Sequence, residues 1–199
     1  MNESELSAEE AHVKPRGSLL VVALLTLLAT LTAQAQLPQT LDEMKAQHVL
    51  LATTPEGAVE AFFGACFVYM NPATRDAGRE MLQYLALPLK GEASWDRLPS
   101  QRLFTQYLVD VDRQHVWRSY AKGATPENGY RINPNDWELD VEATRLAEDE
   151  DRGLQVHVNS SGADAPRVVY VKQDRESGLW YVSDWDELLE DVRSPMSAR

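Results

Sequence analysis

The hydrophobic period of this sequence changes once, and this change limits the folds that the chain can adopt. Between residues 54 and 111 apolar residues recur at steps of three and four, which is the spacing of one face of an α-helix. Between residues 137 and 183 apolar and polar residues alternate, as in strands with one solvated face. Helices followed by such strands predict an α+β domain, in which amino-terminal amphipathic helices pack on a curved antiparallel sheet of three to five strands.

The first helix is predicted to begin at Thr54-Pro55-Glu56. The threonine can cap free amides, proline suits the first helical position, and the glutamate favours the positive end of the helix dipole. Its apolar stripe contains Phe63, Cys66 and Phe67, which we predict to be core residues facing the sheet. We interpret Cys66 as a small buried apolar residue rather than as a nucleophile or a redox thiol. Asn71-Pro72 is predicted to end the helix.

Shorter elements are expected to follow. They are helices over 74–87 and 98–111, strands over 137–144, 154–158, 167–173 and 179–183, and a closing helix over 186–193. The acidic run 148–153 is the predicted turn of the first hairpin. Residues 112–134 are the hardest to place: the pattern of 115–120 is compatible with a short strand, and 125–129 is a predicted turn.

The amino-terminal segment has the order of an export signal. Residues 1–17 are polar and carry Lys14 and Arg16, residues 18–32 are uncharged and largely apolar, and Ala33-Gln34-Ala35 offers small residues for cleavage. An uncleaved inner-membrane anchor is the alternative, since the acidic stretch before the apolar run is long for a signal peptide. We expect an exported protein, periplasmic or extracellular, that meets the membrane only through this segment. The predicted parts are a signal peptide (1–35), a linker or irregular helix (36–52), one α+β domain (53–193) and a disordered tail (194–199).

The charge of the chain restricts its partners. Lys and Arg number 19 against 31 Asp and Glu, which gives a net charge of -12. Residues 1–35 carry four glutamates, one lysine and one arginine, so a chain without them has a charge of -10. Such a field repels anions at long range, so we expect no nucleic acid partner but a neutral or cationic one. The densest basic stretch, 113–122, is interrupted by aromatic residues and forms no basic cluster in the sequence.

The sequence has no motif that marks a catalytic, cofactor or metal site. A single Cys excludes an intrachain disulfide and a cysteine zinc cage, and the four histidines have no paired ligand spacing. Neither a glycine-rich phosphate loop nor a Gly-x-Ser-x-Gly elbow occurs. The run Glu148-Asp149-Glu150-Asp151 lacks the register of an EF-hand loop, so we interpret it as a solvated hairpin tip. We therefore predict no catalytic residue, no cofactor and no metal.

Two resemblances add to this interpretation. The order of helices and strands, with the closing Leu179-Trp180-Tyr181-Val182-Ser183-Asp184-Trp185, resembles the NTF2-like (cystatin-like) roll of small exported bacterial proteins. The first half, with Thr54-Pro55-Glu56 and Phe62-Phe63, resembles the extracytoplasmic module of some mechanosensitive channel proteins. The NTF2-like resemblance implies a cone between helices and sheet, where enzymes of that family gather acid and base groups. The residue types are present in Tyr69, Tyr107, Asp110, Asp112 and His115, but their spacing marks no dyad.

We predict a binding or protein-interaction module of the cell envelope without catalytic machinery. Its partner would be an unknown protein or a small apolar ligand, and both a monomer and a homodimer stay open. The alternative is a small NTF2-like enzyme of the isomerase, dehydratase or hydrolase type with its site in the cone. The candidate pocket or interaction residues are Phe63, Tyr107, His115, Trp117 and Trp185.

Overall fold

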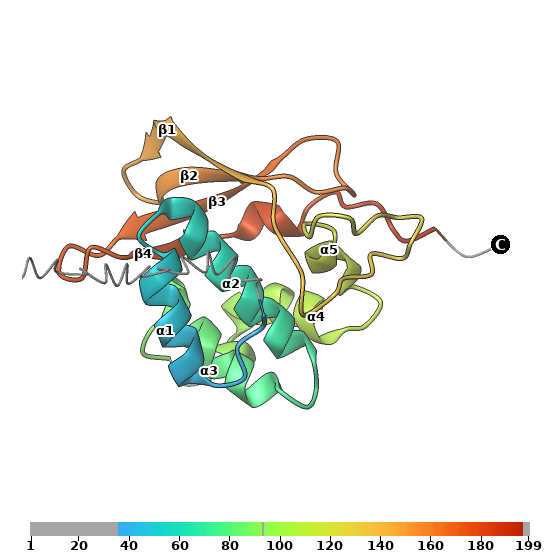
Figure 1. Ribbon diagram of the computed structural model, residues 1–199, viewed down its shortest axis with the longest axis horizontal. Helices are drawn as coiled ribbons and strands as arrows, with labels where there is room; N and C mark the ends of the chain where they lie inside the picture. The colour runs from blue at the N-terminus through green and yellow to red at the C-terminus, as the bar shows by residue number, and fades with distance from the viewer. Residues whose placement is uncertain (1–35, 93, 197–199) are drawn as a thin grey trace, which may run out of the picture. The chain divides into compact units, whose positions relative to one another are not determined.

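The computed structural model describes residues 36–92 and 94–196, without the side chains of 143–148, and these residues belong to one compact unit. The expected signal segment lies outside the described residues. As predicted, the domain is α+β, with helices on one side of an open, curved antiparallel sheet (Figure 1). No helix of residues 36–92 or 94–196 combines the length and the apolar character that crossing a membrane requires.

The sheet is an antiparallel meander with the strand order β1-β2-β3-β4. Its strands are β1 (Val141–Asp149), β2 (Gly153–Val158), β3 (Arg167–Gln173) and β4 (Trp180–Asp184). Buried valines set the register: Val156 lies opposite Val169, and Val171 lies opposite Val182. The pairing shifts once in β1 and once in β3, and such irregularities bend a strand.

Helix α2 (Pro55–Met70) is the centre of the domain and contacts all four strands. It begins as predicted, because the Thr54 hydroxyl accepts a hydrogen bond from the Gly57 N–H at 3.1 Å. Asn71 ends it, also as predicted. Phe63, Cys66 and Phe67 are buried, which confirms the predicted core stripe.

Helix α1 (Leu41–Leu51) occupies the segment that we expected to be a linker or an irregular helix. The helix is regular because Thr40 caps it, accepting from the Glu43 N–H at 3.2 Å, and because tertiary contacts cover one of its faces. His48 of this helix is fully buried, and its Nε2 atom lies 2.9 Å from the Trp180 carbonyl oxygen. The Trp180 N–H in turn donates to the Ala52 carbonyl at 2.9 Å. Both contacts join α1 to the start of β4.

Helix α3 (Arg75–Leu85) agrees with its prediction apart from a shorter end, where the 3-10 turn η1 (Leu87–Leu89) follows. The predicted helix over 98–111 is α4 (Arg102–Val109), preceded by the 3-10 turns η2 (Trp95–Arg97) and η3 (Pro99–Gln101). The predicted closing helix is only one 3-10 turn, η4 (Asp186–Leu189).

The short strand expected over 115–120 is wrong. These residues form one helical turn, α5 (His115–Arg118). The reason is that Val116, Trp117 and Tyr120 are all buried, and this spacing fits a helix and not the alternation of a strand.

The first strand of the predicted meander begins later than expected. The strand predicted over 137–144 begins at Val141, although Trp137 and Leu139 are buried with exposed neighbours, as the alternation requires. Leu139 forms only an isolated bridge to Ala121. At the carboxyl end, residues 194–196 run along the domain, where the Met196 N–H donates to the Pro126 carbonyl at 2.9 Å, while 197–199 lie outside the described residues.

Candidate functional site

Aromatic side chains fill the space between the helices and the sheet. Phe63, Trp117 and Trp185, three of the residues singled out from the sequence, are buried there. The ring centroids of Phe63 and Trp117 lie 5.6 Å apart, and those of Phe104 and Trp185 lie 4.8 Å apart. These residues are therefore core residues, and their rings do not line an open cavity.

The other two candidates lie at the surface with separate local partners. Tyr107 is partly exposed. The Arg113 guanidinium lies over the Tyr107 ring, 5.2 Å from the ring centroid. The Nδ1 atom of His115 lies 2.7 Å from the Asp112 carbonyl, so Nδ1 carries the proton. The ring is tilted against that of Tyr130, with the centroids 5.7 Å apart. Within the described residues no hydrogen bond or ring contact joins Tyr107 to His115, so the structure shows no acid-base pair between them.

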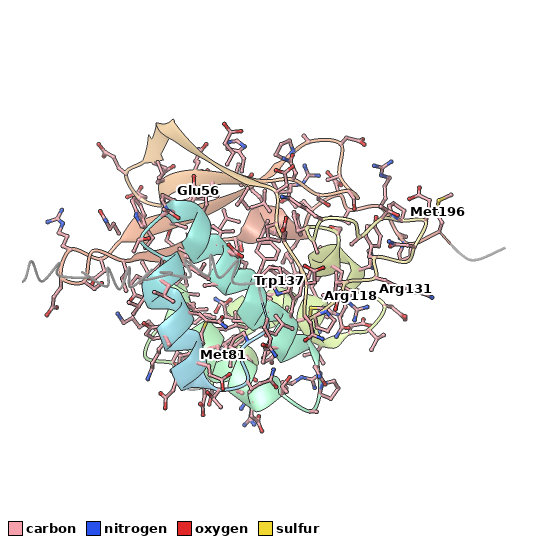
Figure 2. All side chains as sticks on the ribbon, viewed as in Figure 1. Glu56, Met81, Arg118, Arg131, Trp137 and Met196 are labelled. Carbon is pink, nitrogen blue, oxygen red and sulfur yellow. The ribbon has the colours of Figure 1, made fainter. Side chains whose placement is uncertain are left out.

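A groove of about 620 Å³ opens at the carboxyl end of α2, where α3, α5 and the segment 131–134 meet. We call it the arginine groove, because Arg75, Arg118 and Arg131 line it. Figure 2 shows Arg118 and Arg131 on the same side of the domain. Among the residues that the structure describes, no acidic one lines the groove, although acidic residues outnumber basic ones in the chain. The apolar part of the lining is Leu37, Phe67, Met70, Val109, Val111 and Ile132.

Arg118 is held in this groove by a buried amide. Its Nη2 donates to the Gln114 side-chain oxygen at 2.8 Å. The Gln114 nitrogen donates to the carbonyls of Met70 at 3.1 Å and Leu108 at 2.8 Å, so both amide hydrogens are used and the oxygen must face Arg118. Gln114 itself is only 4% exposed. This hydrogen bond orients the Arg118 guanidinium in the groove.

The charge of Arg118 has no carboxylate partner in the described part of the chain. Arg79 and Arg113, by contrast, pair with Asp96 and Asp110. Burial lowers the pKa of Arg118, but the guanidinium of an arginine is not deprotonated in proteins. Arg118 is thus a half-buried cation without a carboxylate partner among the described residues, and buried charges in proteins are usually paired.

Arg75 and Arg131 complete the cationic part of the groove. Arg75 is the first residue of α3, and its Nε donates to the Tyr69 carbonyl at 3.3 Å, which leaves the terminal nitrogens for a ligand. Arg131 is exposed and follows the turn that ends at Gly129. The three arginines therefore come from three separate segments of the chain.

A smaller hollow of about 230 Å³ adjoins the arginine groove, and Leu37, Phe67, Asn71 and Pro134 line both. We call it the amide end, because its polar lining consists of Gln39, Asn71, Thr74 and Asn135. The Asn71 oxygen accepts from the Ala73 N–H at 3.0 Å, so its amide NH₂ is left to donate. The groove and the amide end together offer cationic, apolar and amide surfaces to one ligand.

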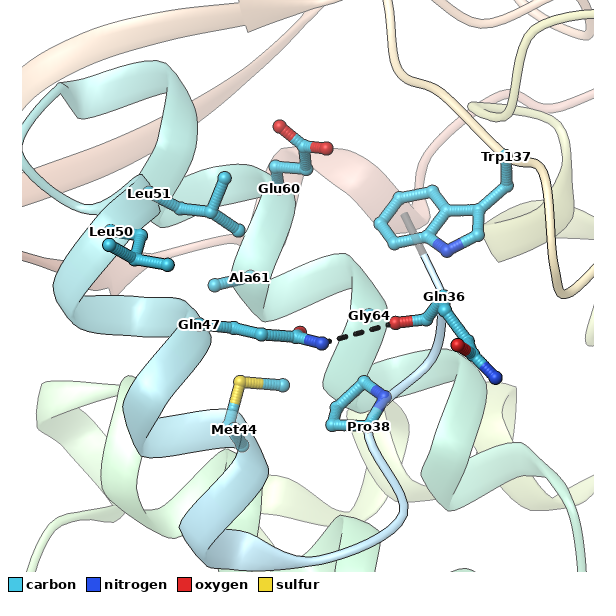
Figure 3. A pocket seen from close by; sticks show the side chains of 10 residues that line it. All are labelled: Gln36, Pro38, Met44, Gln47, Leu50, Leu51, Glu60, Ala61, Gly64 and Trp137. Atoms are coloured by element: carbon cyan, nitrogen blue, oxygen red, sulfur yellow. Dashed lines mark hydrogen bonds between the residues drawn. The ribbon is translucent and has the colours of Figure 1, made fainter. Parts of the chain in front are cut away.

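A third hollow lies between α1, α2 and Trp137 (Figure 3). Its volume of about 110 Å³ suits only a small apolar group. Gln47 closes one side by donating to the Gln36 carbonyl at 3.2 Å. Glu60 lies at its edge, where burial and the nearby Glu138 charge raise its pKa. The lining combines apolar side chains with Gln36, Gln47 and Glu60, and this combination identifies no ligand.

Sequence reasoning missed the arginine groove because no sequence signal marks it. Arg75, Arg118 and Arg131 lie far apart in the chain, and α5, which carries Arg118, resembled a strand. The expected neutral or cationic partner followed from the total charge, whereas the local charge of the groove is positive. A half-buried arginine can be recognised only after the fold places it.

The comparisons with known proteins identify one family. A model of the family DUF6935, described as a domain of unknown function, matches residues 36–196. No curated protein and no solved structure matches the chain.

Proposed function

This chain belongs to the DUF6935 family, and we propose that it is a binding module whose arginine groove holds an anionic group of its partner. The observation that carries the proposal is Arg118, which is half-buried, fixed by Gln114 and without a carboxylate partner among the described residues. An anion in the groove would make charge-assisted hydrogen bonds with this guanidinium and offset its loss of water.

Two further observations support a binding function. The space that a cone-shaped active site would use is filled by the rings of Phe62, Phe104 and Trp185. Exposed apolar side chains border the groove, with Val111 exposed by 73% and Val109 by 37%. A ligand that combines an anionic group with an apolar body would cover both surfaces.

Export to the cell envelope is part of the same proposal. It rests on the order of charge, apolar run and small residues in residues 1–35. Protein isolated from the native envelope fraction should begin at Gln36 by intact-mass measurement. A mature chain that begins at Met1 and leaves the membrane only with detergent would show an anchor in place of a signal peptide.

The binding proposal is tested with octanoate and octyl sulfate as anionic probes and octylammonium as the cationic control. Isothermal titration of the full chain should detect the two anions and not the cation. Arg118→Gln should weaken binding of the anions at least tenfold. Arg175→Gln, which removes the same charge from an exposed turn outside the groove, should bind like the wild type. Failure of both anions to bind, or equal binding by Arg118→Gln, would contradict the proposal.

A further inference from the structure

We infer that the arginine groove takes the carboxyl-terminal end of a polypeptide, with the terminal carboxylate on the arginines and the peptide backbone along the amide end. This inference rests on the binding function proposed above and names the ligand class. It follows from the three chemical surfaces that two adjoining hollows offer.

The cationic surface suits a carboxylate. A guanidinium presents five N–H donors in one plane and can hold both oxygens of a carboxylate at once. Arg118 uses one Nη2 donor on Gln114, and Arg75 uses its Nε on the Tyr69 carbonyl. Each of the two arginines keeps further donors for a ligand oxygen.

The amide end suits a peptide backbone. The Asn71 amide has its oxygen engaged by Ala73, so its NH₂ can donate to a ligand carbonyl. Asn135, on the opposite segment of the chain, adds a second side-chain amide. Both asparagines are exposed, so water can bind their amides when no ligand does. The successive peptide groups of a polypeptide supply acceptors and donors for such side chains, and the hydrocarbon of a fatty acid does not.

The apolar surface of the arginine groove suits the last side chains of the ligand. Val109, Val111 and Ile132 line the groove beside Arg118 and Arg131. A polyanion such as a nucleic acid would bring repeated charge past this apolar surface and would meet a chain of net charge -12. A single terminal carboxylate matches the arginines, and apolar side chains beside it match the apolar lining.

The test compares paired peptides that differ only at the end of the chain. The probes are fluorescein-labelled octapeptides whose last three residues vary among Ala, Val, Leu and Phe, each made as the free carboxylate and as the amide. Fluorescence polarisation with the full chain should show that at least one free-acid peptide binds tenfold or more tightly than its amide. Arg118→Gln and Arg131→Gln should reduce this ratio toward one, and Arg175→Gln should preserve it.

Folding of each variant is checked by circular dichroism, and Arg131→Gln, at an exposed position, tests the inference if Arg118→Gln unfolds. Equal binding of acid and amide peptides would overturn the inference. If octanoate binds in an Arg118-dependent way while no peptide binds, the ligand class is wrong and the anion-binding function stands. If neither probe class binds, both proposals fail.

Discussion

Arg118 donates a hydrogen bond of 2.8 Å to Gln114, whose own amide hydrogens are both held by backbone carbonyls of α2 and α4. This contact connects the packing of two helices to the position of a guanidinium in the groove. Gln114 is buried and acts on the groove through Arg118, so we treat it as a positioning residue.

Replacing Gln114 by Leu should therefore affect stability and binding together. The substitution leaves the Met70 and Leu108 carbonyls without their donor, which costs about 1–3 kcal/mol of unfolding free energy. Urea denaturation measures this loss. Gln106→Leu, the same change at an exposed site, should alter stability by less than about 0.5 kcal/mol. Binding of octanoate by a folded Gln114→Leu variant at wild-type strength would show that Gln114 does not position Arg118.

His48 should make the stability of the domain dependent on pH. Its Nε2 donates to the Trp180 carbonyl at 2.9 Å, and its Nδ1 accepts from the Tyr84 hydroxyl at 3.3 Å, so the neutral ring satisfies both partners. Burial lowers the pKa of His48 below 6.5, and the unfolded chain therefore binds the proton more readily than the folded one. The unfolding free energy should fall as the pH drops below about 6.5.

Urea denaturation at pH 7.5 and pH 5.5 measures this dependence. Because other groups of the chain also titrate, the quantity to compare is the difference between the wild type and His48→Gln at each pH. The stability difference should shrink at pH 5.5, where the wild type loses the contribution of neutral His48. A difference that is the same at both pH values would contradict the assignment.

Gly153 should tolerate no side chain. Its φ is +109°, and a Cβ placed on it would lie 2.3 Å from the Val171 carbonyl oxygen of the neighbouring strand. Gly153→Ala should destabilise the domain by about 1–3 kcal/mol through backbone strain alone, with the steric clash added to it. Gly178→Ala is the matched control, since Gly178 also has a positive φ, +71°, but nothing lies within 4 Å of its Cβ position. Equal thermal stability of the two variants would show that the close approach at Gly153 is absent.

Phe63 should be among the residues on which the fold depends most. It is fully buried and contacts the rings of Phe67, Trp117 and Tyr120. Phe63→Ala should cost about 3–5 kcal/mol, a large part of the 5–15 kcal/mol typical of a domain. Leu103→Ala, at a side chain that is 54% exposed, should change stability far less. A loss below about 1 kcal/mol for Phe63→Ala in a reversible urea melt would mean that the ring is not packed.

The fold class, the central helix α2 and the order of the strands could be predicted because they depend on local patterns. Thr54-Pro55-Glu56 starts α2 by capping, and the alternation around Val156 and Val158 marks one buried face. The errors fall where tertiary contacts override local preference. The α1 helix depends on the burial of Met44 and His48, and the α5 turn depends on the burial of Val116 and Trp117.

By itself the sequence determined the α+β class, the position and core face of α2, and a surplus of acidic charge over the whole chain. Only the tertiary structure decided which of the candidate aromatic residues are core and where positive charge gathers. Arg75, Arg118 and Arg131 are distant in sequence and become one surface because α2 ends where α3 begins and α5 packs beside it. The spacing of apolar residues depends on neighbours in the sequence, so helices and strands can be predicted from it. The burial of a charge and the absence of a carboxylate beside it depend on how distant segments pack.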